Sequence, residues 1–154
     1  MQRVTNCILM NEDKILMLQK PRRGWWVAPG GKMEPGESVK ESVKREYREE
    51  TGLMIQNPEI KGIFTIVMIE DDKIVSEWMM FTFVARDYEG NLLEQSPEGD
   101  LEWKNIDDVL GLRMAEGDKF IFKHIIDSKE PLLGTFHYTP DFKLLSYRLE
   151  PNVG

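Results

Sequence analysis

Three glutamates stand at helical spacing, because Glu49 and Glu50 follow Glu46 by three and four residues. On an α-helix these positions share one face, so the three carboxylates would lie together and repel one another. Hard divalent cations such as Mg²⁺ and Mn²⁺ bind carboxylate oxygens and keep positions open for water and phosphate. The spacing therefore predicts a site for one of these cations. The alternative interpretation is a solvated acidic helix face.

The neighbouring sequence predicts a loop followed by a helix that presents these acids. Ser38 and Glu41 form a capping-box pattern at the start of the helix, and Gly52 is placed to end it in a left-handed conformation. Upstream, Pro29-Gly30-Gly31 and Pro35-Gly36 are expected to turn. The apolar stripe that should be buried recurs at helical spacing and consists of Val39, Val43 and Tyr47. We expect the three glutamates to project away from this stripe.

Residues 31–53 resemble the Nudix box, the signature of a superfamily of hydrolases. The residues in register with its pattern are Gly31, Glu37, Arg45, Glu46, Glu49, Glu50, Gly52 and Leu53. Tyr47 stands where the pattern has a bulky aliphatic residue. The resemblance implies an α+β fold, the Nudix-type α/β/α sandwich with a mixed β-sheet. It also implies hydrolysis of a nucleoside diphosphate linked to another group, by attack of water on phosphorus.

The resemblance, together with the chemistry of phosphoryl transfer, suggests a role for each residue of the box. Glu46, Glu49 and Glu50 would bind Mg²⁺ or Mn²⁺, with the Gly31 carbonyl as an additional ligand. Arg45 would orient the glutamates through its guanidinium. The remaining two positions are structural: Glu37 would hold the loop against the helix, and Gly52 would end the helix. One of the glutamates, or an acid from another loop, would accept the proton of water.

Composition and charge restrict the class of protein. The chain has 154 residues, which predicts a single domain over residues 1–154. Its net charge of −7 argues against a nucleic-acid polymer as partner, although a nucleotide can be held through metal. No stretch is apolar enough to span a bilayer, and the first residues lack the apolar region of a signal peptide. We interpret the single cysteine, Cys7, as a core residue in a reducing cytoplasm. A monomer and a homodimer are both compatible with the sequence.

The rest of the chain is predicted to form strands and two further helical segments. The polar stretch 87–100 is expected to be a loop, Ile106–Val109 a helical turn and Gly117–Asp127 a second full helix. The expected strands lie at residues 4–10 and 14–19, 60–69 and 73–85, 101–103, 135–138 and 143–149. The strands form hairpins wherever a short polar turn separates two of them.

A second resemblance concerns the substrate. The segment Trp26 to Lys32, the tryptophan at 103 and the chain ending 136–149 are similar to the MutT-type branch, in particular to hydrolases of oxidised purine nucleoside triphosphates. The resemblance implies conversion of 8-oxo-dGTP to the monophosphate and pyrophosphate. It makes Glu98 a candidate metal ligand or general base, the alternative being an ordinary loop acid. Lys32 would touch a phosphate, unless it is a solvated loop lysine.

This chain departs from that branch at the residues that recognise the base. Val27 replaces an asparagine that reads the oxidised purine, Ala115 replaces a stacking tryptophan, and Gly117-Asp118 replaces a pair of acids. Loss of the asparagine removes a bidentate hydrogen-bonding partner, worth about 1–3 kcal/mol of discrimination. Asp118 would accept a hydrogen bond from a purine N–H, or else it is a helix N-terminal acid favoured by the helix dipole. Selectivity for 8-oxoguanine is thus left open.

Two aromatic and two basic residues before the box are further candidates for substrate contacts. Trp25 and Trp26 are adjacent in an extended segment, so they point to opposite sides, and one of them would stack on a base while the other packs inward. Of the two, Trp26 is the substrate-binding candidate, from its place in the resemblance. Arg22 and Arg23 would contact phosphates, unless they are exposed loop charges; Arg23 is the substrate-binding candidate.

Two other classes of function compete with this interpretation. One is a non-catalytic Nudix-fold module that senses a nucleotide or metabolite, which the complete set of box glutamates disfavours. The other is a Nudix hydrolase that acts on another nucleoside diphosphate derivative. The residues typical of ADP-ribose or dinucleoside polyphosphate hydrolases are absent past the box, where this chain reads Ile69-Glu-Asp71.

Overall fold

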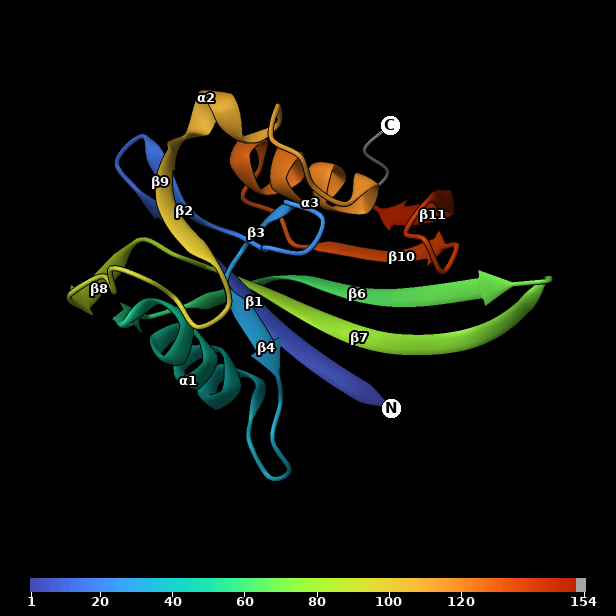
Figure 1. Ribbon diagram of the computed structural model, residues 1–154, viewed down its shortest axis with the longest axis horizontal. Coiled ribbons are helices and arrows are strands. Elements are labelled where there is room, and N and C mark those ends of the chain that lie inside the picture. The colour runs from blue at the N-terminus through green and yellow to red at the C-terminus, as the bar shows by residue number, and fades with distance from the viewer. Residues whose placement is uncertain (152–154) are drawn as a thin grey trace.

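The computed structural model describes residues 1–151, and its central feature is a mixed β-sheet with helices on both faces (Figure 1). The sheet order is β11-β10-β6-β7-β1-β2-β3, with β4 paired to β1 and β9 paired to β2. The strand bounds are β1 Gln2–Asn11, β2 Lys14–Gln19, β3 Trp26–Val27, β4 Gly30–Lys32, β6 Glu59–Glu70, β7 Lys73–Ala85, β9 Asp100–Asn105, β10 Leu132–Tyr138 and β11 Leu144–Glu150. A separate two-stranded sheet pairs β5 (Leu53–Gln56) with β8 (Asp87–Gly90).

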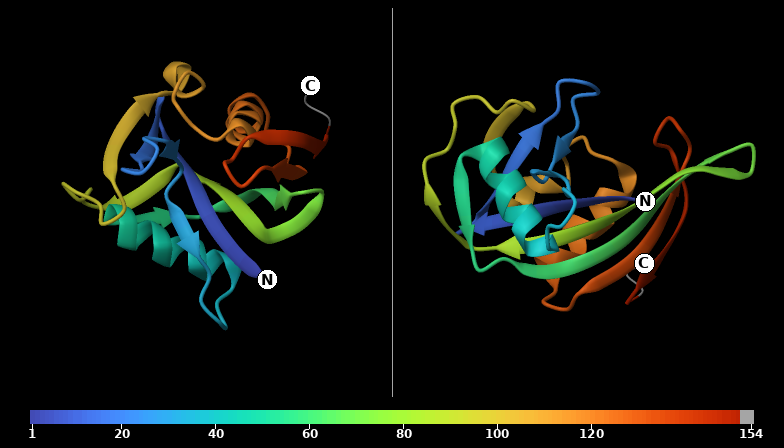
Figure 2. Two further views of the ribbon diagram at one scale, coloured as in Figure 1. Left: turned by 45° about the vertical axis from the view of Figure 1, so that its right-hand side comes forward. Right: turned by 90° about the horizontal axis from the view of Figure 1, so that it is seen from below.

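Strand pairing is parallel at two places, β1 with β7 and β10 with β6, and antiparallel in the other pairs of the main sheet. Helix α1 (Val39–Thr51) covers one face, and α2 (Ile106–Val109) and α3 (Glu116–Asp127) cover the other, as both views of Figure 2 also show. The predicted α/β/α sandwich with a mixed sheet is therefore confirmed. None of the helices within residues 1–151 has the length and apolar character needed to cross a membrane.

Side chains of strand β1 alternate between the two layers of the core, as expected for a strand buried on both faces. Ile8 and Met10 belong to the large cluster beneath α3, and Cys7 and Leu9 belong to the cluster beneath α1. Cys7 is fully buried, and burial raises the pKa of its thiol above the usual range. These properties agree with a core role for this residue.

Helix α1 has the ends that its sequence predicts. The Ser38 hydroxyl accepts a hydrogen bond from the Glu41 N–H, and the Glu41 carboxylate accepts one from the Ser38 N–H. Gly52 adopts a left-handed conformation with φ of 83°. Val43 and Tyr47 are fully buried, whereas Val39 at the first turn is partly exposed. These features fix the rotation of the helix and hence the direction of its acids.

Two predictions of local structure were wrong. Pro29-Gly30-Gly31 does not turn, because Gly30 to Lys32 form strand β4 against β1 and neither glycine has a positive φ. Residues 87–100 are not wholly a loop, because strand β8 occupies the first four positions. The turn at Pro35-Gly36 is present, with a φ of 88° at Gly36, and the predicted hairpins are present as well.

Candidate active site

Glycines 30 and 31 allow helix α1 and strand β4 to approach each other closely. A Cβ atom on Gly31 would lie 2.3 Å from Glu46 Oε2, and one on Gly30 would lie 2.0 Å from the Thr5 carbonyl oxygen. The contact at Gly31 would be with a side chain of the candidate site, and the contact at Gly30 would be with the backbone of strand β1. The glycine pair therefore serves close packing rather than a turn, and it places the Glu46 carboxylate directly against the backbone of Gly31.

Arg45 connects the box loop to the acids of α1. Its guanidinium donates two hydrogen bonds to the Glu37 carboxylate, from Nε at 2.6 Å and from Nη2 at 2.9 Å. Nη2 also donates to the Lys32 carbonyl oxygen at 3.0 Å. Nη1 donates to Glu46 at 3.0 Å and to Glu49 at 3.1 Å. Arg45 and Glu37 thus hold the loop against the helix and fix two of the three predicted metal ligands.

Arg45 and Glu37 each shift the pKa of the other in the direction that favours its charged form. Hydrogen bonds from Arg45, and one from the Glu34 N–H, lower the pKa of Glu37 to about 2. The pKa of Arg45 is raised above its usual range, mainly by Glu37. Both groups therefore stay charged at any physiological pH, as a fixed orienting pair requires.

Glu50 differs from the other two glutamates because its residue is only 6% exposed. The expectation that all three acids point away from the core was therefore wrong for this position. Burial raises the pKa of the Glu50 carboxyl to about 7, and the nearby Glu46 and Glu98 add to the shift. Lys20 and a hydrogen bond from the Gly30 N–H to Oε1 at 3.3 Å act in the opposite direction. The site thus holds an incompletely neutralised buried carboxylate.

The loop that carries Glu98 lies close to the acids of α1, although the two segments are far apart in sequence. Glu98 contributes electrostatically to the raised pKa of Glu50 and forms an ion pair with Lys20, whose Nζ is 3.5 Å from Oε2. The candidate acid from the late loop is thus brought to the site. Lys20 was missed in the sequence; the available signal was its position directly after strand β2, where strand ends often carry functional side chains.

Lys20, which pairs with Glu98, also lines a cavity of about 570 Å³. The size of this cavity is in the range of small-molecule sites. Most of its lining is aromatic or apolar, with the Asp118 carboxyl as the acidic group and basic side chains on one side. The lining residues are Lys20, Arg22, Arg23, Trp25, Val27, Ile66, Trp78, Met80, Ala115, Asp118, Tyr138, Pro140 and Phe142. Burial raises the pKa of Asp118 to about 7.

The two tryptophans point to different sides, as predicted for adjacent residues of an extended segment. The one that faces the cavity is Trp25 and not Trp26. Trp25 lines the cavity, whereas Trp26 is not part of its lining and stacks beneath Lys104, whose Nζ is 4.2 Å from the ring centroid. The orientation could not be fixed from sequence because either residue of an alternating pair can face inward. Arg23 also lines the cavity. Lys32 is exposed and contributes its backbone carbonyl to Arg45.

The donor chemistry of the α1 acids fits a hard divalent cation, although the side chains are not preassembled around one point. Among residues 1–151, no group of three acidic, histidine or cysteine side chains is arranged to hold a metal ion. Glu46 and Glu49 instead both accept hydrogen bonds from Arg45. The available donors are nevertheless all oxygens, and Glu50 is a buried carboxylate in need of positive charge. The residues therefore fit a cation after rotation of the glutamate side chains.

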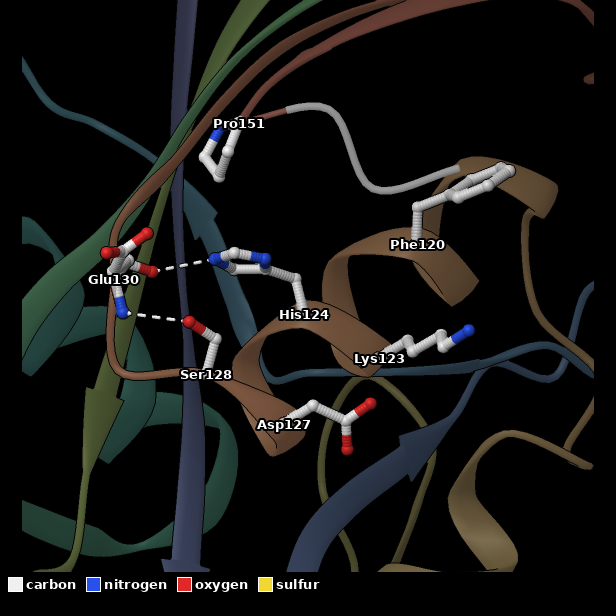
Figure 3. Close-up of a pocket in the computed structure, with 7 residues that line it drawn as sticks. All are labelled: Phe120, Lys123, His124, Asp127, Ser128, Glu130 and Pro151. Atoms are coloured by element: carbon white, nitrogen blue, oxygen red, sulfur yellow. Dashed lines mark hydrogen bonds between the residues drawn. The ribbon is translucent and has the colours of Figure 1, made fainter.

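A second cavity, of about 360 Å³, lies along α3 and involves none of these acids (Figure 3). The His124 ring points from α3 toward the following turn, where its Nε2 lies 2.7 Å from the Glu130 carbonyl oxygen. The Ser128 hydroxyl accepts a hydrogen bond from the Glu130 N–H in the same turn. His124 thus fastens the end of α3 to the turn that follows it.

The model of the NUDIX domain family matches residues 1–125, and the chain therefore belongs to the Nudix family and is a Nudix hydrolase. It is 60% identical to the uncharacterised Nudix hydrolase YvcI of Bacillus subtilis, over 98% of this chain and 96% of that protein. It is also similar to the crystal structure of a MutT protein from Bacillus halodurans, with 66% identity, a TM-score of 0.97 and coverage of 99% and 100%. The predicted MutT-like character is confirmed.

A more distant relative is the human 8-oxo-dGDP phosphatase NUDT18, which is 37% identical over 61% of this chain. The matched region spans 27% of the length of that protein.

Proposed function

We propose that this Nudix hydrolase cleaves nucleoside di- and triphosphates to nucleoside monophosphates, with oxidised purine nucleotides such as 8-oxo-dGTP as its most specific substrates. The observation that carries the proposal is the position of Lys20, which lines the cavity that holds Asp118, forms an ion pair with Glu98 and acts through its charge on Glu50 of α1. Phosphates would lie at the acids and the base in the cavity. The names of the similar proteins, a MutT protein and an 8-oxo-dGDP phosphatase, support the same substrate class.

We assign Glu46, Glu49 and Glu50, with the Gly31 carbonyl as a further donor, to binding of Mg²⁺ or Mn²⁺. Nudix hydrolases generally use divalent cations. Such a cation, when bound, neutralises charge on the phosphate oxygens and lowers the pKa of a coordinated water. Arg45 and Glu37 hold the box loop and the carboxylates of α1 close together, so the oxygen donors lie near one another and would need only side-chain rotation to surround the cation.

In the reaction a water oxygen forms a bond to phosphorus, and the bond from that phosphorus to the bridging anhydride oxygen breaks. For 8-oxo-dGTP the products are 8-oxo-dGMP and pyrophosphate. A carboxylate of the site, Glu98 or one of the box glutamates, accepts the proton of water. Lys20 and Lys32 are the cations available to the phosphates, with Lys20 nearest to the acids because it pairs with Glu98.

For the base, we assign recognition to Asp118 and stacking to Trp25 in place of Trp26. Asp118 lies in the cavity and can exchange hydrogen bonds with a purine edge in either protonation state, because its pKa is close to neutrality. Val27 also lines the cavity and offers no hydrogen bond. Discrimination between oxidised and ordinary purines therefore depends on Asp118.

We further propose that residues 1–154 act as one cytoplasmic domain, as a monomer or a homodimer, without a nucleic-acid polymer as partner. Strands β10 and β11 follow the region of the family match and complete the main sheet, which supports a single domain. Residues 152–154 of this range lie outside the described residues.

The test is Mg²⁺-dependent release of phosphate and pyrophosphate from a panel of substrates. The panel contains ordinary and oxidised deoxynucleoside di- and triphosphates, ADP-ribose and a dinucleoside polyphosphate. We expect the highest kcat/KM on an oxidised purine nucleotide. A higher value on ADP-ribose or the dinucleoside polyphosphate would contradict the proposed substrate class, and binding without turnover of any compound would favour a nucleotide sensor.

A further inference from the structure

Two turns that are far apart in sequence meet at the edge of the Asp118 cavity. Arg23, in the turn 21–24, places its guanidinium carbon 5.1 Å from the ring centroid of Trp25 and 5.3 Å from that of Phe142. Its Nη1 also donates a hydrogen bond to the Asp141 carbonyl oxygen at 3.3 Å. Arg23 therefore joins the segment before the box to the turn between β10 and β11.

Phe142 is held in an unusual backbone conformation by these contacts. Its φ is 62°, which is uncommon for a bulky residue. Its N–H donates to the Thr139 carbonyl oxygen at 2.9 Å. Its ring lies edge-on to Trp25, with centroids 5.6 Å apart, and 5.5 Å from Tyr138. The turn is thus shaped so that an aromatic ring, rather than a small polar side chain, faces the cavity.

The other walls of the cavity offer fewer surfaces for stacking. The residue at the start of α3 that lines it, Ala115, has no ring, and the Tyr138 hydroxyl is fixed by a hydrogen bond from the Gly117 N–H at 2.8 Å. A planar base that reaches Asp118 would therefore meet the rings of Trp25, Trp78 and Phe142. Of these, Phe142 belongs to the turn whose position depends on Arg23.

We propose that Phe142 stacks on the substrate base beside Trp25 and that Arg23 is a positioning residue that holds Phe142 there. This inference rests on the proposed function, because it assumes a nucleotide in the cavity. It makes the C-terminal hairpin turn a determinant of substrate specificity that selects for planar aromatic bases. Stacking on an aromatic side chain tolerates different bases, so this contact provides affinity, while the edge of the base is read elsewhere.

The test compares two substrates that differ only in the base, namely 8-oxo-dGTP and deoxyribose 5-triphosphate. Phe142→Leu removes the ring but keeps an apolar side chain, and we expect it to raise KM for 8-oxo-dGTP about tenfold with little change in kcat. The kinetics of the base-free triphosphate should not change. Phe142→Trp should restore a low KM for 8-oxo-dGTP. Equal effects of Phe142→Leu on both substrates, or none on either, would overturn the proposal.

Phe120→Leu is the matched control, because Phe120 lies in α3, packs against Tyr147 with ring centroids 4.4 Å apart and lines the second cavity (Figure 3). It should leave both KM values unchanged. For Arg23, we expect Arg23→Met to raise KM for 8-oxo-dGTP only. An equal rise for the base-free triphosphate would assign Arg23 to a phosphate instead and overturn its positioning role.

A binding measurement separates failure of this inference from failure of the proposed function. Absence of turnover by the wild-type protein would contradict the proposed function alone. Quenching of tryptophan fluorescence by a non-hydrolysable 8-oxo-dGTP analogue would then decide on stacking, because Trp25 and Trp78 line the cavity. We expect about tenfold weaker binding to Phe142→Leu than to the wild type and to Phe120→Leu. Equal binding to all three proteins would overturn the stacking role.

Discussion

Alanine at Gly31 should impair catalysis with little loss of stability, whereas alanine at the adjacent Gly30 should destabilise the fold. Neither glycine has a positive φ, so alanine can adopt both backbone conformations. The difference lies in what the new methyl group meets. At Gly30 it meets the backbone of β1, with the Thr5 carbonyl oxygen at 2.0 Å and the Asn6 Cα at 2.6 Å. At Gly31 it meets the end of the Glu46 side chain, with Oε2 at 2.3 Å.

The size of each effect depends on whether the atoms that meet the new methyl group can move away. Strand β1 lies inside the sheet and is paired to β7, β4 and β2, so it cannot yield, and we expect Gly30→Ala to cost about 3 kcal/mol of unfolding free energy. The Glu46 carboxylate can rotate back by about 1 Å to an ordinary contact distance, which costs little stability and is offset by the lower entropy of the unfolded alanine chain. A displacement of about 1 Å at a reacting centre can reduce the rate by about 100-fold.

Urea unfolding and Mg²⁺-dependent phosphate release measure the two effects separately. Gly31→Ala should unfold within about 1 kcal/mol of the wild type and lose about 100-fold in kcat. Gly30→Ala should unfold at a clearly lower urea concentration. A fully active Gly31→Ala protein would refute the placement of Glu46 at the catalytic centre, and a Gly30→Ala protein of wild-type stability would refute the packing argument.

Three further predictions concern the helix, the cavity and its rim. The Tyr47 hydroxyl is buried and has no hydrogen-bond partner among residues 1–151, so Tyr47→Phe should raise the unfolding free energy by about 1 kcal/mol, and a loss of stability in urea would contradict this. Because burial raises the pKa of Asp118 from 3.8 to about 7, the folded state binds its proton more tightly than the unfolded state does. Stability should therefore fall between about pH 4 and pH 7 in the wild type, and Asp118→Asn should lose that part of the pH dependence, as thermal melts at several pH values would show. Lys20→Met should raise KM for triphosphates about tenfold with a change in stability below about 1 kcal/mol, because the Lys20–Glu98 pair is largely exposed. A large loss of stability with an unchanged KM would assign Lys20 a structural role.

The sequence was most informative where local rules determine the structure. The capping box at Ser38, the left-handed Gly52 and the apolar positions Val43 and Tyr47 define α1, and the structure contains each of these features. Short polar turns between apolar segments likewise identified the hairpins. The box signature placed Arg45 and its acid partners in one cluster, because their spacing on one helix suffices to bring them together.

The remaining features depend on contacts between distant segments. Gly30 and Gly31 look like a turn in sequence, and only the proximity of β1 and Glu46 shows that they provide close packing. The surroundings of Glu50, which include the Gly30 N–H of β4 and the charge of Glu98, come from segments far from the helix and cannot be read from helical spacing. The roles that we propose for Lys20 and Phe142 arise from the way the sheet brings turns together.

The most direct test of the account is Mg²⁺-dependent pyrophosphate release from 8-oxo-dGTP by Glu49→Gln beside Glu89→Gln. Both variants replace one exposed carboxylate with an amide, but Glu49 belongs to the cluster on α1 and Glu89 lies in β8. We expect Glu49→Gln to abolish metal-dependent turnover with the fold retained, and Glu89→Gln to match the wild type. Wild-type rates in Glu49→Gln would contradict the assignment of the α1 acids as the catalytic metal site.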